Sequence, residues 1–352
     1  MTAHPLTRLR ATSFGAFADI DVELAPGLNV IIGENGAGKS QLTKLLYTAT
    51  NVLSTPDALA SAAPRKSAMN TAVAAKLMGV FRPESLGRLT NRRRGRTRAQ
   101  VAVTLAGSGT MSFAFANTAK TEVQTDELPE GWIADSAVYL PTRELLSIYP
   151  GFVSLYNERR VEFDETWRDT ADLLGRVPLR GPRESKVRSV LAPLEEALGG
   201  NVVEENGRFY LQQRGVGKLE MHLVAEGLRK LAMLVRLVSS GTLLTSGYLF
   251  WDEPETNLNP KTLREVAATI VSLSREGVQV FIATHSLFLL REIEILLATD
   301  ARDLRASTTF IGLHRTEEGV VVEQGSTVAD VGDISALHAE LRQAGEYLEQ
   351  VE

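Results

Sequence analysis

The sequence contains no cysteine. This absence excludes disulfides, thiolate metal sites and a cysteine nucleophile, and it fits the reducing cytoplasm. The chain also lacks any run of about 18 apolar residues, the length that a membrane-spanning helix needs. Its first residues, MTAHPLTRLRATSFGAF, have no apolar core of a signal peptide. We therefore expect a cytoplasmic protein without a membrane partner.

An excess of charge of one sign is also missing. The chain has 38 Lys and Arg against 43 Asp and Glu, a formal net charge of −5, so any nucleic-acid surface must be a local patch. One candidate is RLTNRRRGRTR, Arg88–Arg98, where six arginines gather without an intervening aromatic residue. This basic segment could bind DNA or RNA, dock an acidic partner protein, or be a solvated loop.

Strand and helix patterns alternate along most of the chain. Residues 28–33 (LNVIIG) form an apolar run typical of a buried strand, and residues 248–253 (YLFWDE) and 278–285 (VQVFIATH) also have strand patterns. A segment with helical spacing follows each of them. This order predicts an α/β fold in which helices flank a mostly parallel sheet. Residues 308–325 predict a terminal hairpin, and residues 335–350 a last helix.

The middle of the chain interrupts this alternation. Residues 51–200 contain the basic segment, a hairpin pattern at 99–117 and a mainly helical pattern from 142 onwards. We therefore expect a discontinuous core, residues 1–50 and 201–352, which includes an antiparallel β lobe. Residues 51–200 would be an inserted, mainly helical lobe.

A glycine-rich loop joins the first apolar run to its helix. GENGAGKS, residues 33–40, has the pattern G-x-x-x-x-G-K-S, whose glycines let backbone N–H groups approach phosphates. Lys39 would reach the β- and γ-phosphates, and Ser40 would bind Mg²⁺. The sequence thus predicts ATP and Mg²⁺ as cofactors. The nucleotide-binding candidates are Gly33, Glu34, Asn35, Gly36, Ala37, Gly38, Lys39, Ser40 and Gln41.

Three acids end a later apolar strand, in FWDEPETNLNP at 250–260. Asp252 suits a ligand of Mg²⁺, and Glu253 suits a general base that orients and polarises the attacking water. The strand end would hold both carboxylates rigidly. Glu255 is a candidate supporting acid or a surface residue. The alternative for the whole stretch is a solvated strand end.

Taken together, GENGAGKS, WDEPETNLNP and FIATHS resemble the ABC-type ATPases. Within them the chain is similar to the soluble branch that includes RecF, the SMC proteins and the overcoming-lysogenization-defect nucleases. It most resembles the bacterial AAA-family ATPases, ABC-like in mechanism, that occur in phage-defence operons. The resemblance covers about residues 1–50 and 215–315. It implies a P-loop NTPase core of the ABC-ATPase type.

The resemblance also implies roles for residues outside the glycine-rich loop. His285 would contact the γ-phosphate and help to orient water. Asn259 stands in the D-loop, which crosses the dimer interface and usually has Asp there. In the Q-loop position, no Gln is present, and Arg143 or Glu144 would couple the nucleotide to the lobe. Phe14 or Phe17 would stack on adenine or pack in the core.

The signature segment of these ATPases corresponds to Val224–Leu228. Ala225 replaces the usual Ser, so a hydroxyl that contacts the opposite γ-phosphate is missing. Backbone N–H groups near Gly227 could still bind phosphate at a helix N-terminus, with Arg229 or Lys230 as a source of charge. A plain amphipathic helix is the alternative.

In ABC-type ATPases, the phosphate loop of one subunit and the signature of another enclose each ATP. The resemblance therefore implies a head-to-tail homodimer that closes on ATP and opens after hydrolysis. The predicted function is an ATPase that controls a separate effector, a nuclease or toxin encoded nearby, in anti-phage defence. The alternatives are a RecF-like DNA-repair ATPase and, with less support, the nucleotide-binding subunit of a transporter.

Overall fold

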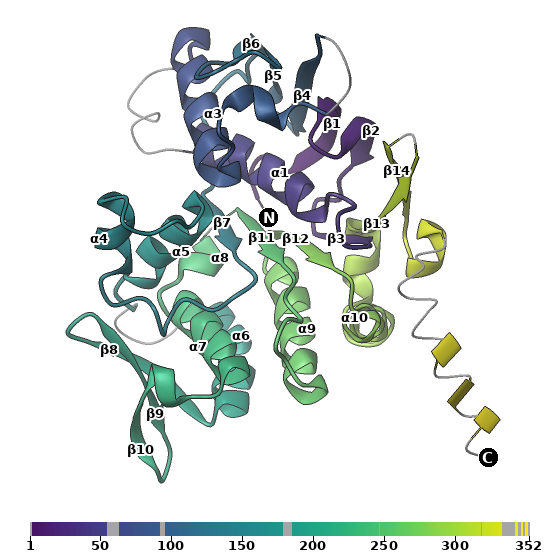
Figure 1. Cartoon of the computed structure of the whole chain (residues 1–352). Helices are drawn as coiled ribbons and strands as arrows, with labels where there is room; N and C mark the ends of the chain where they lie inside the picture. Colours follow the sequence, from purple (N-terminus) through teal and green to yellow (C-terminus); the bar gives the residue numbers. More distant parts are fainter. Residues whose placement is uncertain are drawn as a thin grey trace.

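A computed structural model describes most of the chain (Figure 1). Within the described residues lie a six-stranded sheet, a five-stranded sheet and a three-stranded sheet. The helix predicted at 335–350 falls largely outside them. The described residues are 2–54, 63–91, 96–178, 185–245, 247–317, 319–332, 342–343, 346–347 and 349–350.

The central sheet has the strand order β14-β13-β3-β12-β11-β7. Neighbouring strands are parallel, except that β13 and β14 form the predicted antiparallel hairpin. Every residue of β3, β11 and β12 is buried, because layers cover both faces of the sheet. The predicted α/β class is thus confirmed. The strands are β3 (Leu28–Gly33), β7 (Ala137–Leu140), β11 (Tyr248–Asp252), β12 (Gln279–Thr284), β13 (Thr308–Thr316) and β14 (Gly319–Gly325).

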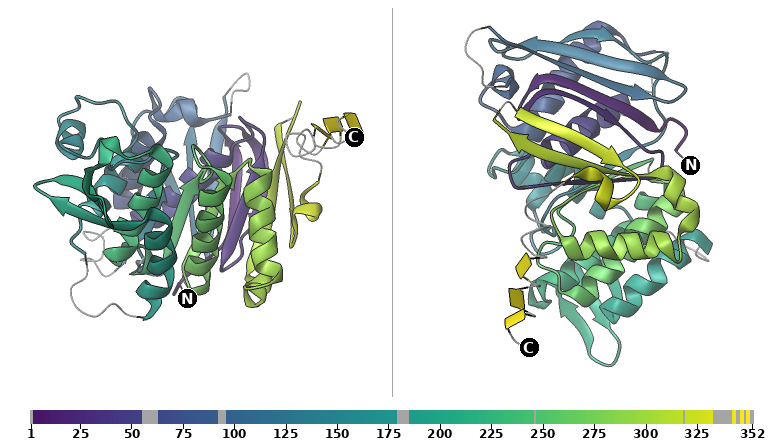
Figure 2. Two further views of the ribbon diagram at one scale, coloured as in Figure 1. Left: turned by 90° about the horizontal axis from the view of Figure 1, so that it is seen from below. Right: turned by 90° about the vertical axis from the view of Figure 1, so that its right-hand side faces the viewer.

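Alternate side chains of the central strands face two different layers, as the pleat requires. Leu249 and Trp251 of β11 pack into a core with the helices below the sheet in Figure 1, whereas Tyr248 and Phe250 pack into a second core above it (Figures 1 and 2). The first layer holds α4 (Phe152–Asn157), α5 (Glu165–Leu174), α6 (Ser185–Leu198), α7 (Glu226–Ser239), α8 (Thr242–Thr245), α9 (Pro260–Arg275) and α10 (Leu287–Ala298).

The second layer combines two helices, α1 (Lys39–Leu53) and α3 (Lys66–Phe81), with an antiparallel sheet of order β2-β1-β4-β5-β6. Its hairpin β4–β5 is the one predicted at 99–117. The strands are β1 (Leu6–Phe14), β2 (Phe17–Glu23), β4 (Arg98–Leu105), β5 (Gly109–Ala116) and β6 (Gln124–Glu127).

Strands of residues 51–200, which we expected to be an inserted lobe, pair with strands from the two ends of the chain. Residues 100–105 of β4 pair with β1, and β7 pairs with β11 in the central sheet. Apolar side chains on these strands complete the two cores next to residues from both ends of the chain. The strands of this segment therefore extend the sheets of the expected core, and the division into domains stays a prediction.

Two local patterns have different outcomes. The hairpin predicted around Asn206-Gly207 is present as β8 (Gly200–Glu205) and β9 (Arg208–Gln213), with both turn residues at positive φ. β10 (Gly217–Glu220) completes this small sheet. Residues 142–151, at the start of the mainly helical pattern predicted from 142, form turns bounded by Pro141 and Pro150, whereas the pattern after them contains α4, α5 and α6. In the described part of the chain, no helix combines the length and apolarity needed to cross a membrane.

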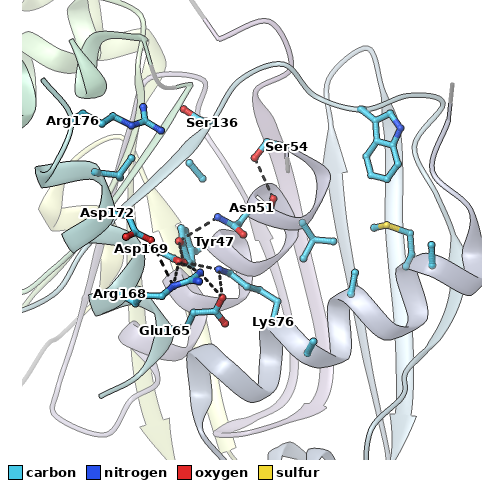
Figure 3. A pocket seen from close by; sticks show the side chains of 18 residues that line it. Tyr47, Asn51, Ser54, Lys76, Ser136, Glu165, Arg168, Asp169, Asp172 and Arg176 are labelled. Carbon is cyan, nitrogen blue, oxygen red and sulfur yellow. Dashed lines mark hydrogen bonds and ion pairs between the residues drawn. The ribbon is translucent and has the colours of Figure 1, made fainter. Parts of the chain in front are cut away.

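A charged cluster ties the helices of the two layers together at a pocket of about 790 Å³ (Figure 3). Asp169 of α5 accepts hydrogen bonds from the Tyr47 hydroxyl (2.5 Å), Lys76 Nζ (2.6 Å) and Arg168 Nη2 (2.5 Å). Lys76 also donates to Glu165 at 3.2 Å. Burial acts to raise the pKa of Asp169, but Lys76, Tyr47 and Arg168 outweigh it and lower that pKa.

Replacing Asp169 with alanine is expected to lower the free energy of unfolding by about 3 kcal/mol at pH 7, because Lys76 loses a buried partner. The lowered pKa means that this stabilisation is present above the unfolded-state pKa of about 3.9 and is lost as the pH falls through the folded-state value. Urea unfolding at pH 7 and at low pH measures both effects. Asp172→Ala, at a more exposed carboxylate, is the control and should change stability by less than about 0.5 kcal/mol.

Candidate nucleotide site

The glycine-rich loop lies between β3 and α1, as the sequence predicts. Gly36 and Gly38 have φ of 82° and 98°, in the left-handed region that favours glycine. A Cβ on Gly38 would lie 2.6 Å from the Phe17 ring. Only glycine at residue 38 therefore allows the loop to turn into α1 against this ring.

Lys39 begins α1 and folds back over the loop. Its Nζ donates to the carbonyl oxygens of Gly33 (2.7 Å) and Glu34 (3.1 Å), and the residue is 5% exposed. Burial lowers the pKa of Lys39, against the opposing charges of Glu253 and Asp252. Among the described residues its hydrogen-bond partners are these carbonyl oxygens, and an ammonium group so placed is well suited to receive phosphate oxygens.

Ser40 and Asp252 meet across the end of the central sheet. The Ser40 hydroxyl donates to Asp252 Oδ1 at 3.0 Å. Burial raises the pKa of Asp252, although the bond from Ser40 acts to lower it. These are two hard oxygen donors, and one is a carboxylate poorly shielded by solvent. Such a pair fits Mg²⁺, which commonly takes one or two protein ligands besides phosphate oxygens and water.

The acids after Asp252 converge with His285 from the next strand. His285 Nδ1 lies 3.6 Å from Glu253 Oε1 and 3.3 Å from Glu255 Oε1. Glu255 Oε1 also accepts hydrogen bonds from the Thr284 hydroxyl (2.8 Å) and the His285 amide (3.0 Å). The Glu255 side chain is 8% exposed, whereas that of Glu253 is 30% exposed. Glu255 thus anchors the His285 segment, and the Glu253 carboxylate remains accessible.

Glu253 adopts an unusual backbone conformation. Its φ is 47°, and Asn257 in the same turn has φ of 62°. The left-handed region costs a non-glycine residue about 1 kcal/mol or more, so surrounding contacts must maintain it. The Glu253 amide donates to Ala283 O of β12 at 2.8 Å, which fixes one side of the residue.

Sequence reasoning weighed Lys230 only as a source of charge near the signature segment, and it missed the contacts of this residue. Its Nζ donates to the carbonyl oxygens of Glu253 (3.0 Å) and Thr256 (3.3 Å). The residue is 2% exposed, and burial lowers its pKa to about 8. A lysine within the apolar pattern LRKLAMLV was the only signal in the sequence.

The signature-like segment forms the start of α7. Ala225 occupies the N-cap without a side-chain hydrogen bond. Glu226 Oε1 accepts a hydrogen bond from Asn257 Nδ2 at 2.8 Å, and a Cβ on Gly227 would lie 3.1 Å from Asn257 O. Among the described residues, no hydrogen bond or ion pair joins residues 225–227 to the glycine-rich loop.

Other candidates have identifiable structural contacts. Asn259 caps α9, accepting from the Thr262 amide at 2.9 Å. Gln41 Oε1 accepts from the Ala16 amide at 2.8 Å, so its side chain holds the turn between β1 and β2. Phe14 and Phe17 are fully buried, which favours core packing over adenine stacking.

At the Q-loop position, Glu144 is buried and Arg143 is exposed. Glu144 Oε1 accepts from Arg229 Nε at 2.7 Å, which links this position to α7. In the basic segment, residues 92–95 lie outside the described residues. Arg88 pairs with Glu84, and Arg98 donates to Gln124.

Comparison with known proteins decides the family. Residues 28–291 match the AAA_21 family, described as "AAA domain, putative AbiEii toxin, Type IV TA system". This chain belongs to that family. AAA_21 proteins are P-loop ATPases, a class that binds nucleotides and typically Mg²⁺, and the resemblance stated from the motifs is thus confirmed. The comparison with curated proteins gave no match.

Solved structures show that the AAA_21 chain has the fold of SMC heads. One is an Smc head bound to the C-winged helix domain of ScpA, with 13% identity, a TM-score of 0.54 and coverage of 92% of this chain and 98% of the other. Another is an Smc head domain with an extended coiled coil bound to the C-terminal domain of ScpA, derived from Pyrococcus furiosus. It has 12% identity, a TM-score of 0.52 and coverage of 99% of both chains. At these identities the likeness concerns the fold alone, and it confirms the predicted P-loop NTPase core.

Proposed function

We propose that this AAA_21 chain hydrolyses ATP with Mg²⁺, forms a head-to-tail homodimer on ATP and thereby controls a separate effector protein. The observation that carries the proposal is the convergence at the ends of β3, β11 and β12. There Lys39 and Ser40 meet Asp252, beside the cluster of Glu253, Glu255 and His285. This combination supplies donors for phosphate, ligands for Mg²⁺ and a carboxylate for water.

The residues divide the chemical work by their environments. Backbone N–H groups of residues 33–41 and Lys39 would bind the phosphates, while Ser40 and Asp252 would hold Mg²⁺, which neutralises charge on the phosphates. Glu253 would accept the proton of the attacking water. Its accessible carboxylate can reach a water molecule, and the strand end fixes its position. His285, anchored through Glu255, would contact the γ-phosphate and help orient that water.

The placement of the signature-like segment supports dimerisation. Residues 225–227 form no bond with the phosphate loop of their own chain, in the part that the structure describes. Backbone N–H groups at the start of α7 remain suited to bind phosphate, even though Ala225 supplies no hydroxyl. A second copy of the chain, in head-to-tail contact, would bring its α7 to this nucleotide. Asn259, Gly227 and their neighbours would then line the contact between subunits.

The effector and the defence role rest on the comparisons. The family description names a toxin of a type IV toxin–antitoxin system, which supports a nearby gene as partner and a role in anti-phage defence. Smc heads were solved with domains of ScpA bound, which supports a separate protein as the target of the conformational change.

The test measures the rate of ATP hydrolysis and the molar mass in solution of the purified protein. We expect Mg²⁺-dependent ATP hydrolysis, and light scattering should show dimers with MgATP and monomers with MgADP. Turnover by a chain that stays monomeric with ATP would exclude the shared site. Co-expression with the product of the neighbouring open reading frame tests the effector, which should co-purify in one nucleotide state more than in the other.

A further inference from the structure

Lys230 is a buried cation without an evident role in binding nucleotide. It lies on α7, five residues after Ala225, and its ammonium group points to the turn that follows β11. Among the described residues it forms hydrogen bonds with two carbonyl oxygens and no ion pair with a carboxylate. The Trp251 ring lies 6.0 Å from its Nζ. Because this buried ammonium group donates to two backbone carbonyl oxygens of one turn, it restricts the conformation of that turn.

The turn that Lys230 contacts is the strained one. Glu253 and Asn257 both have positive φ. Lys230 Nζ donates to the carbonyl oxygen of Glu253 itself and to that of Thr256, the residue before Asn257. Three amides of the turn have hydrogen-bond acceptors: Glu253 N bonds to Ala283 O, Thr256 N to Glu253 O and Leu258 N to Glu255 O. Glu253 is thus held by β12 through its amide and by α7 through its carbonyl.

We propose that Lys230 is a positioning residue that holds Glu253 in its left-handed conformation and aims its carboxylate at the site of the attacking water. The proposal rests on the proposed role of Glu253 as general base. It goes further in naming the group that keeps this carboxylate in place. Because Lys230 belongs to the helix that begins with the signature-like segment, α7 carries both the surface for the partner's nucleotide and the support of its own chain's Glu253.

Lys230→Met removes the ammonium group, and with it both hydrogen bonds to the turn, and keeps a side chain of similar length. In hydrogen exchange on the nucleotide-free protein, we expect the amides of Glu253, Thr256 and Leu258 to exchange about 10-fold faster than in the wild type. In ATP hydrolysis, kcat should fall at least about 10-fold, while KM changes less than about 3-fold, because the phosphate loop is intact. A residue that only supported the overall fold would not produce this separation of kcat from KM.

Arg236→Met is the matched control. Arg236 lies on the same helix, is also 2% exposed and also donates to two carbonyl oxygens, those of Leu174 and Arg176. It should cost comparable stability, yet leave exchange at residues 253–258 and kcat near their wild-type values. If Lys230→Met does not fold, Lys230→Gln is the milder variant, for which we expect smaller changes in the same direction.

The proposal would be overturned if the Lys230 variant had wild-type amide exchange at residues 253–258 and a wild-type kcat. So would equal changes in the Arg236 variant, since they would indicate general loosening of α7. If the wild-type chain does not hydrolyse ATP, the proposed function fails instead. The exchange of the turn then still decides whether Lys230 holds it.

Discussion

Replacing Glu253 with glutamine is expected to lower kcat for ATP hydrolysis by about 100-fold or more, the size of effect that general-base catalysis contributes. Glutamine keeps the size and one acceptor oxygen of the side chain, but it cannot take the proton from water. The side chain is 30% exposed, and its close partner His285 is 42% exposed, so the fold should be preserved. Steady-state kinetics with MgATP, together with equilibrium binding of ATP, measures the separation of chemistry from binding.

The expected binding constant for ATP in Glu253→Gln lies within about 3-fold of the wild-type value, because phosphate contacts are made elsewhere. Dimers formed with ATP should persist, since the step that ends the closed state is blocked. Glu276→Gln provides the control, at a partly exposed carboxylate that pairs with Lys186. Unchanged turnover in Glu253→Gln would remove Glu253 from the mechanism.

Replacing Lys39 with methionine should abolish the binding of ATP at working concentrations. A hydrogen bond to a charged group contributes about 1.5–3 kcal/mol, or roughly a 10- to 150-fold change in the dissociation constant. The stability of the nucleotide-free protein should not fall, because burial of the Lys39 charge is unfavourable, as the lowered pKa of Lys39 indicates. Calorimetry of ATP binding and thermal unfolding measure the two effects.

Lys66→Met is the corresponding control. Lys66 is an exposed residue of α3 that binds the Asp126 carbonyl, so the same change of side chain should leave the affinity for ATP unaltered. A Lys39 variant that binds ATP as tightly as the wild type would show that the glycine-rich loop does not hold the phosphates through this residue.

The parts of the site that sequence predicts are those set by local order. The conformation of GENGAGKS is determined locally, because the glycines allow the left-handed turns and the helix that follows positions Lys39 and Ser40. The family resemblance assigned Asp252 and His285 to one site, and the structure has the strands before them, β11 and β12, as parallel neighbours that end at the same edge of the sheet. The roles of these residues in catalysis stay predictions until the variants are measured.

Contacts between distant segments could not be predicted in this way. Glu144 and Arg229 are 85 residues apart, and neither the charge nor the helical pattern indicates that they meet. Likewise, the alternating pattern of β4 does not specify β1 as its neighbour, so the sequence predicted only an inserted lobe over residues 51–200 and not this pairing. The sequence showed Lys230 only as a charged residue in an apolar helix. Its acceptors are backbone carbonyl oxygens, which every residue has, so no residue type indicates the contact.

We propose that each catalytic site contains residues of two chains, and a mixture of two inactive variants shows whether it does. Lys39→Met disables the phosphate loop. Ala225→Asp disables the signature-like segment by placing a carboxylate where the partner's phosphates would lie, and it preserves α7 because Asp is a favoured N-cap. In a mixed dimer, one of the two sites has neither defect.

An equal mixture of Lys39→Met and Ala225→Asp should therefore recover activity: about a quarter of the wild-type rate if subunits pair at random, and more if the mixed dimer, which has the intact site, forms preferentially. Each variant alone should be nearly inactive. The recovered rate should also rise with protein concentration, because the mixed dimer must assemble. A mixture no more active than the sum of its two components would contradict a site shared between chains.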